Sequence, residues 1–375
     1  MNTRLVLIMA GGTGGHVFPA LAVADCLRAQ GVAVAWMGTQ EGLEAKLVPD
    51  AGIPLECIDV AGLRGKGPVR LLAMPFMLAR AMWQARTILR RLQPAAVLGM
   101  GGFASGPGGL MARLLGIPLI VHEQNAVSGM TNRWLATCTD HVLQAFPDTF
   151  PAAQHAETVG NPVRAPITAL PPPATRFAAR NDQKYRLLVV GGSRGALALN
   201  QLVPQALALL KADERPEVWH QAGGQLQQAA EDAYRAAEVS AKLTPFINDM
   251  AEAYAWADLV LCRAGALTIA ELAAAGIGAI LIPFPFAVDD HQTANARFLE
   301  QNGAARLFQQ ADLTAEDLAT TLRELFSDRK RLLAMAEAAR HSAMHGAAER
   351  VARVCLEQAR PPSVDDSVVK NHAHE

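Results

Sequence analysis

The sequence predicts an α/β protein made of two doubly wound parallel sheets. Three observations support this: short apolar segments alternate with helix-period segments, the alternation stops once near the middle of the chain, and both halves open on similar glycine-rich turns. The apolar segments are continuous, as is typical of strands buried on both faces. The expected strands are 5–9, 32–36, 96–98 and 119–121 in the first half, and 187–190, 217–220, 259–262 and 279–282 in the second.

Length and composition fit a multidomain globular chain. Its 375 residues are 51% hydrophobic and 18% charged, so it can bury large cores. The net charge of -1 argues against a nucleic-acid-binding protein, which normally carries a basic excess. The five cysteines are scattered without a CxxC pair, which argues against a disulfide framework and favours a reducing cytoplasm. Since no apolar run approaches about 18 residues, we expect a soluble or peripheral protein.

The interruption near the middle predicts the domain boundaries. Residues 161–184 contain five prolines and little periodicity, as linkers do. We therefore expect two domains facing each other across a cleft, a C-terminal helix that can return to the first domain, and a disordered tail. The expected ranges are 1–162 for the first domain, 163–184 for the linker, 185–342 for the second domain, 343–359 for the helix and 360–375 for the tail.

Three glycine-rich turns follow predicted strands, at Gly11–Gly15, Gly99–Gly109 and Gly191–Gly195. Glycine lets the backbone approach a ligand closely, and a helix N-terminus that follows offers free N–H groups and a partial positive charge. Any one of them could be an ordinary tight turn. The three together favour an anionic, phosphate-bearing ligand.

Two of these turns also suggest other chemistries. Gly99–Ala104 matches a dinucleotide fingerprint with Glu123 downstream, the pattern of an NAD-dependent oxidoreductase, but it is not on the first strand. Gly191–Gly195 matches the nucleophile elbow of a serine hydrolase, with Ser193 central and Asp289 and His291 as further triad members, but no oxyanion motif precedes it. There is no P-loop, D-x-D or H-E-x-x-H motif. We therefore expect no metal and no cofactor.

The segment 71–92 combines arginines with apolar residues at helical spacing. No acidic residue occurs between Asp59 and Glu123. This pattern fits a helix on an anionic membrane surface, and it equally fits a helix whose apolar face is buried in its own domain. The residues concerned are Arg64, Lys66, Arg70, Arg80, Arg86, Arg90, Arg91 and Arg113, with Leu71, Leu72, Phe76, Leu78, Met82, Trp83 and Leu89.

Seven segments, taken in order along essentially the whole folded chain, resemble the MurG family of N-acetylglucosaminyltransferases. The resemblance implies a GT-B fold with two Rossmann-like domains and the active site between them. It also implies the reaction, in which the 4-hydroxyl of the N-acetylmuramyl unit of lipid I attacks the anomeric carbon of UDP-N-acetylglucosamine with inversion. The segments are Gly11–Pro19, Gly62–Lys66, Gly101–Gly108, His122–Asn125, Gly160–Arg164, Gly191–Ala196 and Cys262–Thr268.

The resemblance also implies partners and a location. The donor is UDP-N-acetylglucosamine and the acceptor is undecaprenyl-pyrophosphoryl-N-acetylmuramyl-pentapeptide, so the products are UDP and lipid II of peptidoglycan synthesis. The enzyme would lie peripherally on the cytoplasmic face of the inner membrane, against an anionic surface, with no nucleic-acid partner. The first domain would face the membrane and acceptor, and the second would bind the UDP-sugar. A non-catalytic nucleotide-sugar binding protein on the same scaffold remains an alternative.

The substrate-binding positions follow from the same resemblance. Ser193 would contact the diphosphate, the backbone at Ile247 would read uracil, Glu271 would meet the ribose, and Gln292 would contact the transferred sugar. The full set is Thr13, Gly14, Gly15, Asn125, Arg164, Ser193, Ile247, Ala266, Leu267, Thr268, Ile269, Ala270, Glu271 and Gln292.

The chemistry itself points to a base and to a dipole. A sugar hydroxyl needs a proton acceptor, and His16, directly after the first glycine turn, is the candidate because imidazole can accept a proton near neutral pH. A structural role for His16 remains open, and Glu123 and Asn125 are alternatives for holding the acceptor hydroxyl. With no metal expected, the N–H groups at the start of the helix after Gly265 would stabilise the leaving diphosphate.

Overall fold

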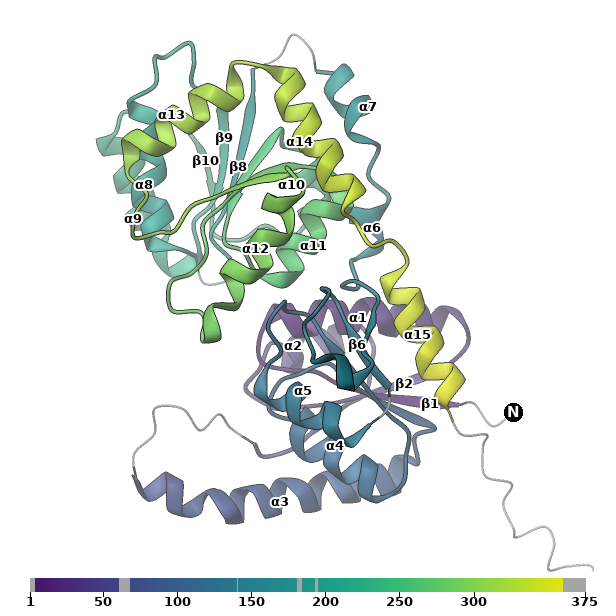
Figure 1. Ribbon diagram of the computed structural model, residues 1–375. Coiled ribbons are helices and arrows are strands. Elements are labelled where there is room, and N and C mark those ends of the chain that lie inside the picture. The colour runs from purple at the N-terminus through teal and green to yellow at the C-terminus, as the bar shows by residue number, and fades with distance from the viewer. Residues whose placement is uncertain (1–3, 61–67, 140, 181–183, 193–194, 360–375) are drawn as a thin grey trace, which may run out of the picture.

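The computed structural model describes residues 4–60, 68–139, 141–180, 184–192 and 195–359. Two α/β domains lie one above the other in Figure 1, each formed by a parallel sheet covered with helices. The eight predicted strands are present, with ends shifted by at most two residues. Five further strands (β3, β6, β7, β10 and β13) extend the two sheets to seven and six strands.

The N-terminal sheet has the strand order β3-β2-β1-β4-β5-β6-β7. The order reverses between β1 and β4, so the loops after these strands meet at the carboxyl edge, where ligands bind in such sheets. Its strands are β1 (Leu5–Met9), β2 (Ala33–Gly38), β3 (Leu55–Cys57), β4 (Ala96–Gly99), β5 (Leu119–Glu123), β6 (His141–Gln144) and β7 (Glu157–Thr158). Its helices are α1 (Gly14–Ala29), α2 (Glu44–Asp50), α3 (Pro68–Leu92), α4 (Ser105–Leu114) and α5 (Met130–Leu135), with short 3₁₀ turns at Ala136–Cys138 and Ala152–Gln154.

The C-terminal sheet has the order β10-β9-β8-β11-β12-β13, with the corresponding reversal between β8 and β11. Its strands are β8 (Arg186–Val190), β9 (Glu217–Gln221), β10 (Lys242–Thr244), β11 (Leu259–Cys262), β12 (Gly278–Leu281) and β13 (Ala305–Leu307). Its helices are α8 (Leu197–Ala208), α9 (Gln227–Ala236), α10 (Met250–Trp256), α11 (Ala266–Ala275), α12 (His291–Gln301), α13 (Ala315–Phe326) and α14 (Arg329–His341), with 3₁₀ turns at Gly224–Leu226 and Val288–Asp290.

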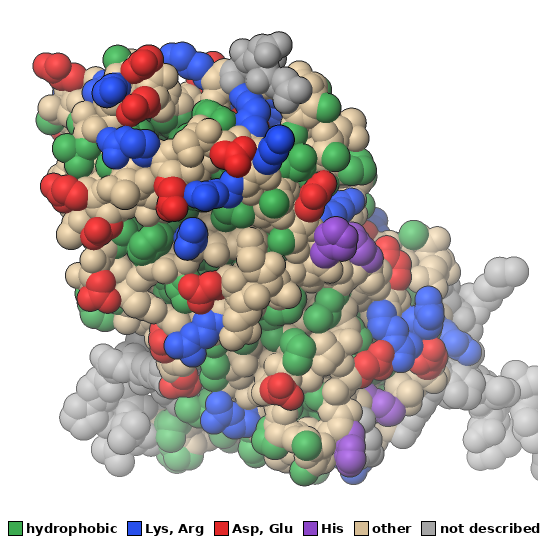
Figure 2. Space-filling view, turned by 45° about the horizontal axis from the view of Figure 1, so that its top comes forward, with side chains coloured by type: hydrophobic (Ala, Val, Ile, Leu, Met, Phe, Trp, Pro, Cys, Tyr) green, Lys and Arg blue, Asp and Glu red, His purple; other side chains and the backbone are tan. Residues whose placement is uncertain are grey.

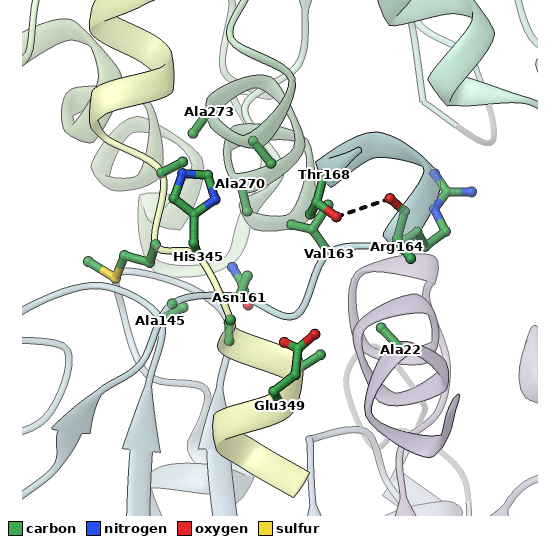
Figure 3. Close-up of a pocket in the computed structure, with 18 of the residues that line it drawn as sticks. Ala22, Ala145, Asn161, Val163, Arg164, Thr168, Ala270, Ala273, His345 and Glu349 are labelled. Carbon is green, nitrogen blue, oxygen red and sulfur yellow. Dashed lines mark hydrogen bonds between the residues drawn. The ribbon is translucent and has the colours of Figure 1, made fainter. Parts of the chain in front are cut away.

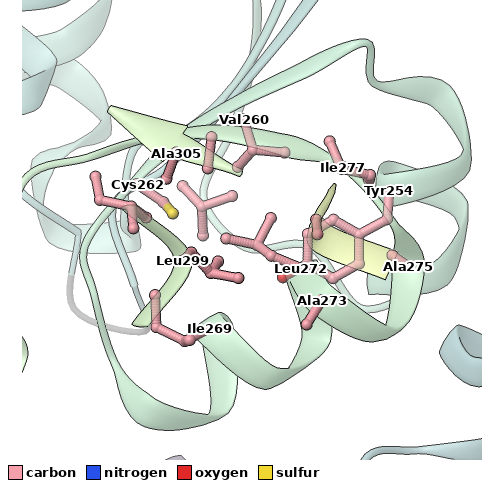
Figure 4. Packing of buried hydrophobic residues seen from close by; sticks show 14 of the residues in the cluster. Tyr254, Val260, Cys262, Ile269, Leu272, Ala273, Ala275, Ile277, Leu299 and Ala305 are labelled. Carbon is pink, nitrogen blue, oxygen red and sulfur yellow. The ribbon is translucent and has the colours of Figure 1, made fainter. Parts of the chain in front are cut away.

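Successive strand residues point to opposite sides of each sheet, and both sides are buried because helices cover them. In the C-terminal domain, Val260 and Cys262 of β11 belong to the same buried cluster as Ile269 and Leu272 of α11 (Figure 4). Leu272 is fully buried, and burial of a leucine side chain contributes about 1.5–3 kcal/mol. This packing fixes α11 on the sheet and therefore fixes the direction in which its N-terminus points.

The segment expected to be a linker contains two short helices, α6 (Ala165–Thr168) and α7 (Pro173–Ala178). Arg176 donates hydrogen bonds to the carbonyls of Tyr254, Ala275 and Gly276. Arg180 forms an ion pair with Asp258 at 3.3 Å. Burial raises the pKa of the Asp258 carboxyl, although Arg180 and the N–H of Arg186 favour its charged form. These contacts fasten the segment to the C-terminal domain.

The last described helix, α15 (Ala347–Gln358), lies against the N-terminal domain. Val351, Ala352 and Cys355 are fully buried there beside α1, and Arg350 pairs with Glu157 of β7 at 2.7 Å. In Figure 1 the chain therefore passes between the domains twice, once before α6 and once between α14 and α15. The tail at 360–375 lies outside the described residues.

Helix α3 has two different faces. In Figure 1 it reaches beyond the rest of the N-terminal domain at the lower left. One face joins the core through Ala81, Ala85, Ile88 and Leu89. The opposite face exposes Phe76 (80%) and Trp83 (65%). Leu78 (49%) is also exposed, although its helical position is on the side of Ala81 and Ala85. The two interpretations of this segment thus separate by face, since one side is core and the other carries uncovered apolar groups.

The arginines beside these apolar groups are partly neutralised. Arg80 pairs with Asp59 and Arg91 pairs with Glu56, each at 2.6 Å. The absence of acidic residues within the segment itself therefore overstates its local charge. Within the described residues, the helices are too short or too polar to span a bilayer. On the face in Figure 2, positive and negative side chains are interspersed.

Candidate active site between the domains

The first glycine turn lies between β1 and α1, at the carboxyl edge of the N-terminal sheet. Gly12 has a φ of +88°, a conformation that favours glycine. Thr13 is the N-cap residue of α1, and its side chain makes no capping hydrogen bond. The N–H groups of Gly14 and Gly15, at the start of this helix, have no acceptor within the helix. The turn therefore presents backbone donors and a hydroxyl that can hold a polar or anionic group.

His16 is half-buried on the first turn of α1. Its Nδ1 lies 3.2 Å from the carbonyl oxygen of Gly11. A carbonyl only accepts hydrogen bonds, so in the neutral ring Nδ1 carries the hydrogen and Nε2 keeps its lone pair. Gly101 lies against the ring, where a Cβ would be 3.1 Å from Nε2. One ring nitrogen is thus held by the turn, and the other can accept a proton.

Glu123, at the end of β5, is 1% exposed and has both carboxylate oxygens occupied. Oε1 accepts from the backbone and side-chain N–H groups of Asn125, at 2.9 and 3.1 Å. Oε2 accepts from the backbone of Gly129 and from Asn132, at 3.1 and 2.9 Å. This geometry favours a positioning role for Glu123, which holds the loop that carries Asn125, over direct contact with a substrate.

Asn295 of α12 is fully buried and joins the two domains at the same loop. Its Oδ1 accepts from the N–H of Ala126 at 2.8 Å, and its Nδ2 donates to the carbonyl of Ala264 at 3.2 Å and to Oδ1 of Asn125 at 3.4 Å. Asn295 therefore brings the loop after β5 close to the loop before α11. Sequence reasoning missed this residue because its partner is 169 residues away.

The N-terminus of α11 is the strongest candidate for an anion site. Gly265 is its N-cap residue with extended backbone and no side-chain cap, and the helix ends at Gly276 in the left-handed conformation. The helix dipole places about half a positive charge at its start. Asn161 of the interdomain segment donates to the carbonyl of Ala266 at 3.4 Å. The predicted residues on this helix are Ala266, Leu267, Thr268, Ile269, Ala270 and Glu271.

Glu271 and Arg164 are paired with each other. The Arg164 guanidinium lies 2.8 Å from Oε1 of Glu271 and 4.9 Å from the ring centre of Phe18 on α1. The Tyr254 hydroxyl donates to Oε2 of Glu271 at 3.1 Å. Burial raises the pKa of the Glu271 carboxyl despite Arg164, and burial together with Glu271 raises the pKa of Tyr254 well above its ordinary value. The carboxylate predicted to meet a ribose is thus occupied by an arginine and a tyrosine.

The remaining predicted residues come from three loops. Ile247 is buried between β10 and α10, and the Oε1 of Gln292, at the start of α12, accepts from the N–H of Phe284 at 2.9 Å. In the third glycine turn, Gly192 (φ +88°) and Gly195 (φ +75°) take positive φ values. Ser193 and the segment 62–66 lie outside the described residues.

The structure shows a pocket of about 630 Å³ at the connections between the domains. Figure 3 places Asn161, Val163, His345 and Glu349 around it. Of the predicted site residues, Arg164, Ile269 and Ala270 line it. The pocket therefore lies at the hinge, and its lining does not include His16 or the first three residues of α11, Ala266–Thr268. Among the described residues, no cluster of three or more metal-ligating side chains occurs.

Comparison with known proteins agrees with this arrangement. Residues 6–144 match the glycosyltransferase family 28 N-terminal domain, and residues 186–351 match the family 28 C-terminal domain. A UDP-N-acetylglucosamine–N-acetylmuramyl-(pentapeptide) pyrophosphoryl-undecaprenol N-acetylglucosamine transferase from Nitrosococcus oceani is 59% identical over 354 residues, which are 94% of this chain and 98% of the relative. The crystal structure of Acinetobacter baumannii MurG has a TM-score of 0.81 at 44% identity, covering 94% of this chain and 99% of that one. The chain belongs to the MurG family.

More distant structures give the fold of this MurG-family chain. The calicheamicin glycosyltransferase CalG4 matches with a TM-score of 0.65 at 17% identity, covering 96% of this chain and all of that one. Together with the two parallel-sheet domains, this confirms the predicted GT-B fold.

The comparisons give no support to the oxidoreductase or hydrolase alternatives. The loop that resembles a dinucleotide fingerprint has another use here. A Cβ on Gly102 would lie 2.7 Å from the carbonyl oxygen of Gly11. The glycines after β4 therefore let two turns of the same domain pack backbone against backbone.

Proposed function

We propose that this chain transfers N-acetylglucosamine from UDP-N-acetylglucosamine to the 4-hydroxyl of the N-acetylmuramyl unit of lipid I. The product would be lipid II, with UDP as the leaving group. One observation supports this beyond the family membership: α1, which carries His16, and α11, whose N-terminus is uncapped, both contact Arg164, α1 through Phe18 and α11 through Glu271. A proton acceptor and an anion site are the two groups that the reaction requires.

The reaction divides between the domains. In the acceptor half, Nε2 of His16 takes the proton of the attacking hydroxyl while its oxygen forms a bond to the anomeric carbon of the donor. The bond from that carbon to the diphosphate oxygen breaks, and its electron pair stays on UDP. The N–H groups at the start of α11, with the hydroxyl of Thr268, stabilise this charge, and loss of one such donor costs about 2.7–4 kcal/mol.

The donor and acceptor positions follow from the same division. The C-terminal domain would hold UDP-N-acetylglucosamine through the turn at Gly191–Gly195, the backbone near Ile247 and the start of α11. The N-terminal domain would hold the acceptor through Thr13, Gly14, Gly15 and Asn125. Closing the space between them would exclude water, which otherwise hydrolyses the donor.

A peripheral membrane location completes the proposal. The acceptor carries an undecaprenyl chain, so the enzyme must work at a lipid surface. The exposed Phe76 and Trp83, seven residues apart on α3, support this, because exposed apolar side chains on one helix face are typical of interfacial helices. We place this face on the cytoplasmic leaflet, with anionic lipid attracting the basic residues beside it.

The decisive experiment measures lipid II formation from a lipid I analogue and UDP-N-acetylglucosamine, with and without a chelator. We expect full activity with EDTA, and a loss of about 10²–10⁴-fold in kcat for His16→Gln with little change in the donor KM. Calorimetry measures binding of the donor independently of product formation. If the donor binds but no product forms under any condition, the chain is a binding protein and the proposal is wrong.

A further inference from the structure

Glu44 is a buried carboxylate to which the sequence analysis gave no role. It begins α2 and is fully buried, although a lone carboxylate is costly to remove from water. Its oxygens accept three hydrogen bonds. Oε1 accepts from the N–H and hydroxyl of Thr39, at 3.0 and 2.7 Å, and Oε2 accepts from the N–H of Gly12 at 2.9 Å. Glu44 is therefore built into the underside of the first glycine turn.

Three glycines make room for this carboxylate. A Cβ on Gly11 would lie 2.4 Å from Oε1, one on Gly38 would lie 2.7 Å from Cγ, and one on Gly42 would lie 1.9 Å from Oε2. No side chain fits at these distances. The glycine at the end of β2 and the one before α2 thus serve the Glu44 side chain, while Gly11 lets that side chain reach the turn.

The contact continues to His16 through one peptide group. The N–H of Gly12 and the carbonyl of Gly11 belong to the same peptide unit, and they point in opposite directions because the bond is trans. Glu44 accepts from the N–H end at 2.9 Å, and Nδ1 of His16 lies 3.2 Å from the carbonyl end. A negative charge on the N–H side also polarises the carbonyl into a better acceptor.

We propose that Glu44 is a positioning residue, which fixes the Nδ1–H tautomer of His16 through the Gly11–Gly12 peptide and so keeps Nε2 turned toward the acceptor. A carboxylate hydrogen-bonded to a catalytic histidine orients the ring directly. Glu44 would have the same effect indirectly, through the peptide group between them. The inference rests on the proposed role of His16 as the base. It adds a residue outside the glycine turns to the catalytic arrangement.

Glu44→Gln is the sharpest variant because glutamine keeps the shape and replaces one acceptor oxygen with a donor. Either Gly12 or Thr39 then faces an NH₂ group. We expect kcat to fall about 10–100-fold, the range typical of partners that orient a functional histidine, with the donor KM changed less than about twofold. Glu41→Gln, an exposed neighbour in the same loop, should leave both constants unchanged.

Two measurements separate positioning from mere folding. Thr39→Val removes only the hydroxyl bond to Oε1 and leaves the Gly12 contact, so it should lower the melting temperature while kcat stays within about twofold. The ¹⁵N chemical shifts of selectively labelled histidine report the tautomer of His16, which should change from Nδ1–H to a mixture in Glu44→Gln. Wild-type kcat in Glu44→Gln, an unchanged tautomer, or an equal kcat loss in Thr39→Val would each overturn the proposal.

A double-mutant cycle with His16→Gln distinguishes the two proposals. If Glu44 acts through His16, Glu44→Gln should cause no further loss in the His16→Gln background. Multiplied losses would show that Glu44 acts elsewhere. Wild-type kcat in His16→Gln alone would instead refute the base assignment, and the tautomer measurement would still decide whether Glu44 orients the ring.

Discussion

Replacing Glu123 by glutamine should destabilise the loop between β5 and α5, residues 124–129, which carries Asn125. We expect this loss of stability to be its main effect, and not a direct effect on the reaction. The carboxylate accepts four hydrogen bonds, two on each oxygen. Glutamine can keep the pair on its remaining oxygen, while its NH₂ group faces the other two donors. Hydrogen bonds to a charged group contribute about 1.5–3 kcal/mol each. The loss of two predicts a destabilisation of about 3–6 kcal/mol.

Urea unfolding followed by tryptophan fluorescence measures this change, because Trp134 lies on α5 directly after the loop. Glu157→Gln is the matched control. It breaks an exposed pair with Arg350, and exposed pairs are worth about 0–1 kcal/mol. A destabilisation below about 1 kcal/mol for Glu123→Gln, together with lost activity, would refute the reasoning and return Glu123 to the list of groups that touch substrate.

Three further predictions concern pH, the membrane and the anion site. Burial lowers the pKa of His122 to about 4 and of His220 to about 3. Below about pH 6.5 these histidines therefore bind protons in the unfolded chain while they stay neutral in the folded chain. Stability should therefore fall as pH drops from about 6.5 toward 4, by up to about 1.4 kcal/mol per pH unit for each histidine, and urea unfolding at pH 7 and 5 checks this. Phe76→Ser with Trp83→Ser should reduce flotation with anionic vesicles at least about tenfold, whereas Leu209→Ser, at an exposed apolar residue of the other domain, should not. Thr268→Val should lower kcat about 10²-fold in the lipid II assay; a value within about twofold would remove Thr268 from the leaving-group site.

The central strands could be predicted from the sequence, while β3, β6, β7, β10 and β13, which lie at or next to the sheet edges, could not. β1, β11 and residues 187–190 of β8 are continuous apolar runs and are buried on both faces. β7 has two residues, both exposed, and β10 has three that are at least partly exposed. Short edge strands have no apolar run to recognise, because their side chains face solvent and only pairing with a neighbour defines them.

In the candidate site, too, some residues could be predicted from the sequence and others could not. The glycine turns were found because a local pattern encodes them. Glu44 and Asn295 were missed because their partners are 32 and 169 residues away, and neither lies in a recognisable motif. The repeated glycines at Gly38 and Gly42 were the one signal for Glu44, since glycine beside a helix start indicates that something must approach closely. The pairing of Glu271 with Arg164 likewise depends on how the interdomain segment folds back.

The double crossing of the chain limits how the two halves can move. A single chain connection would let one domain rotate about it in any direction. Two connections side by side restrict the domains to rotation about one main axis. The two connections are residues 160–164 and residues 342–346. After the second connection, α15 packs against the N-terminal domain. A fragment that stops before α15 would leave an apolar stripe of α1 uncovered. Neither half is therefore a natural unit for separate expression, and opening and closing should follow one repeatable path.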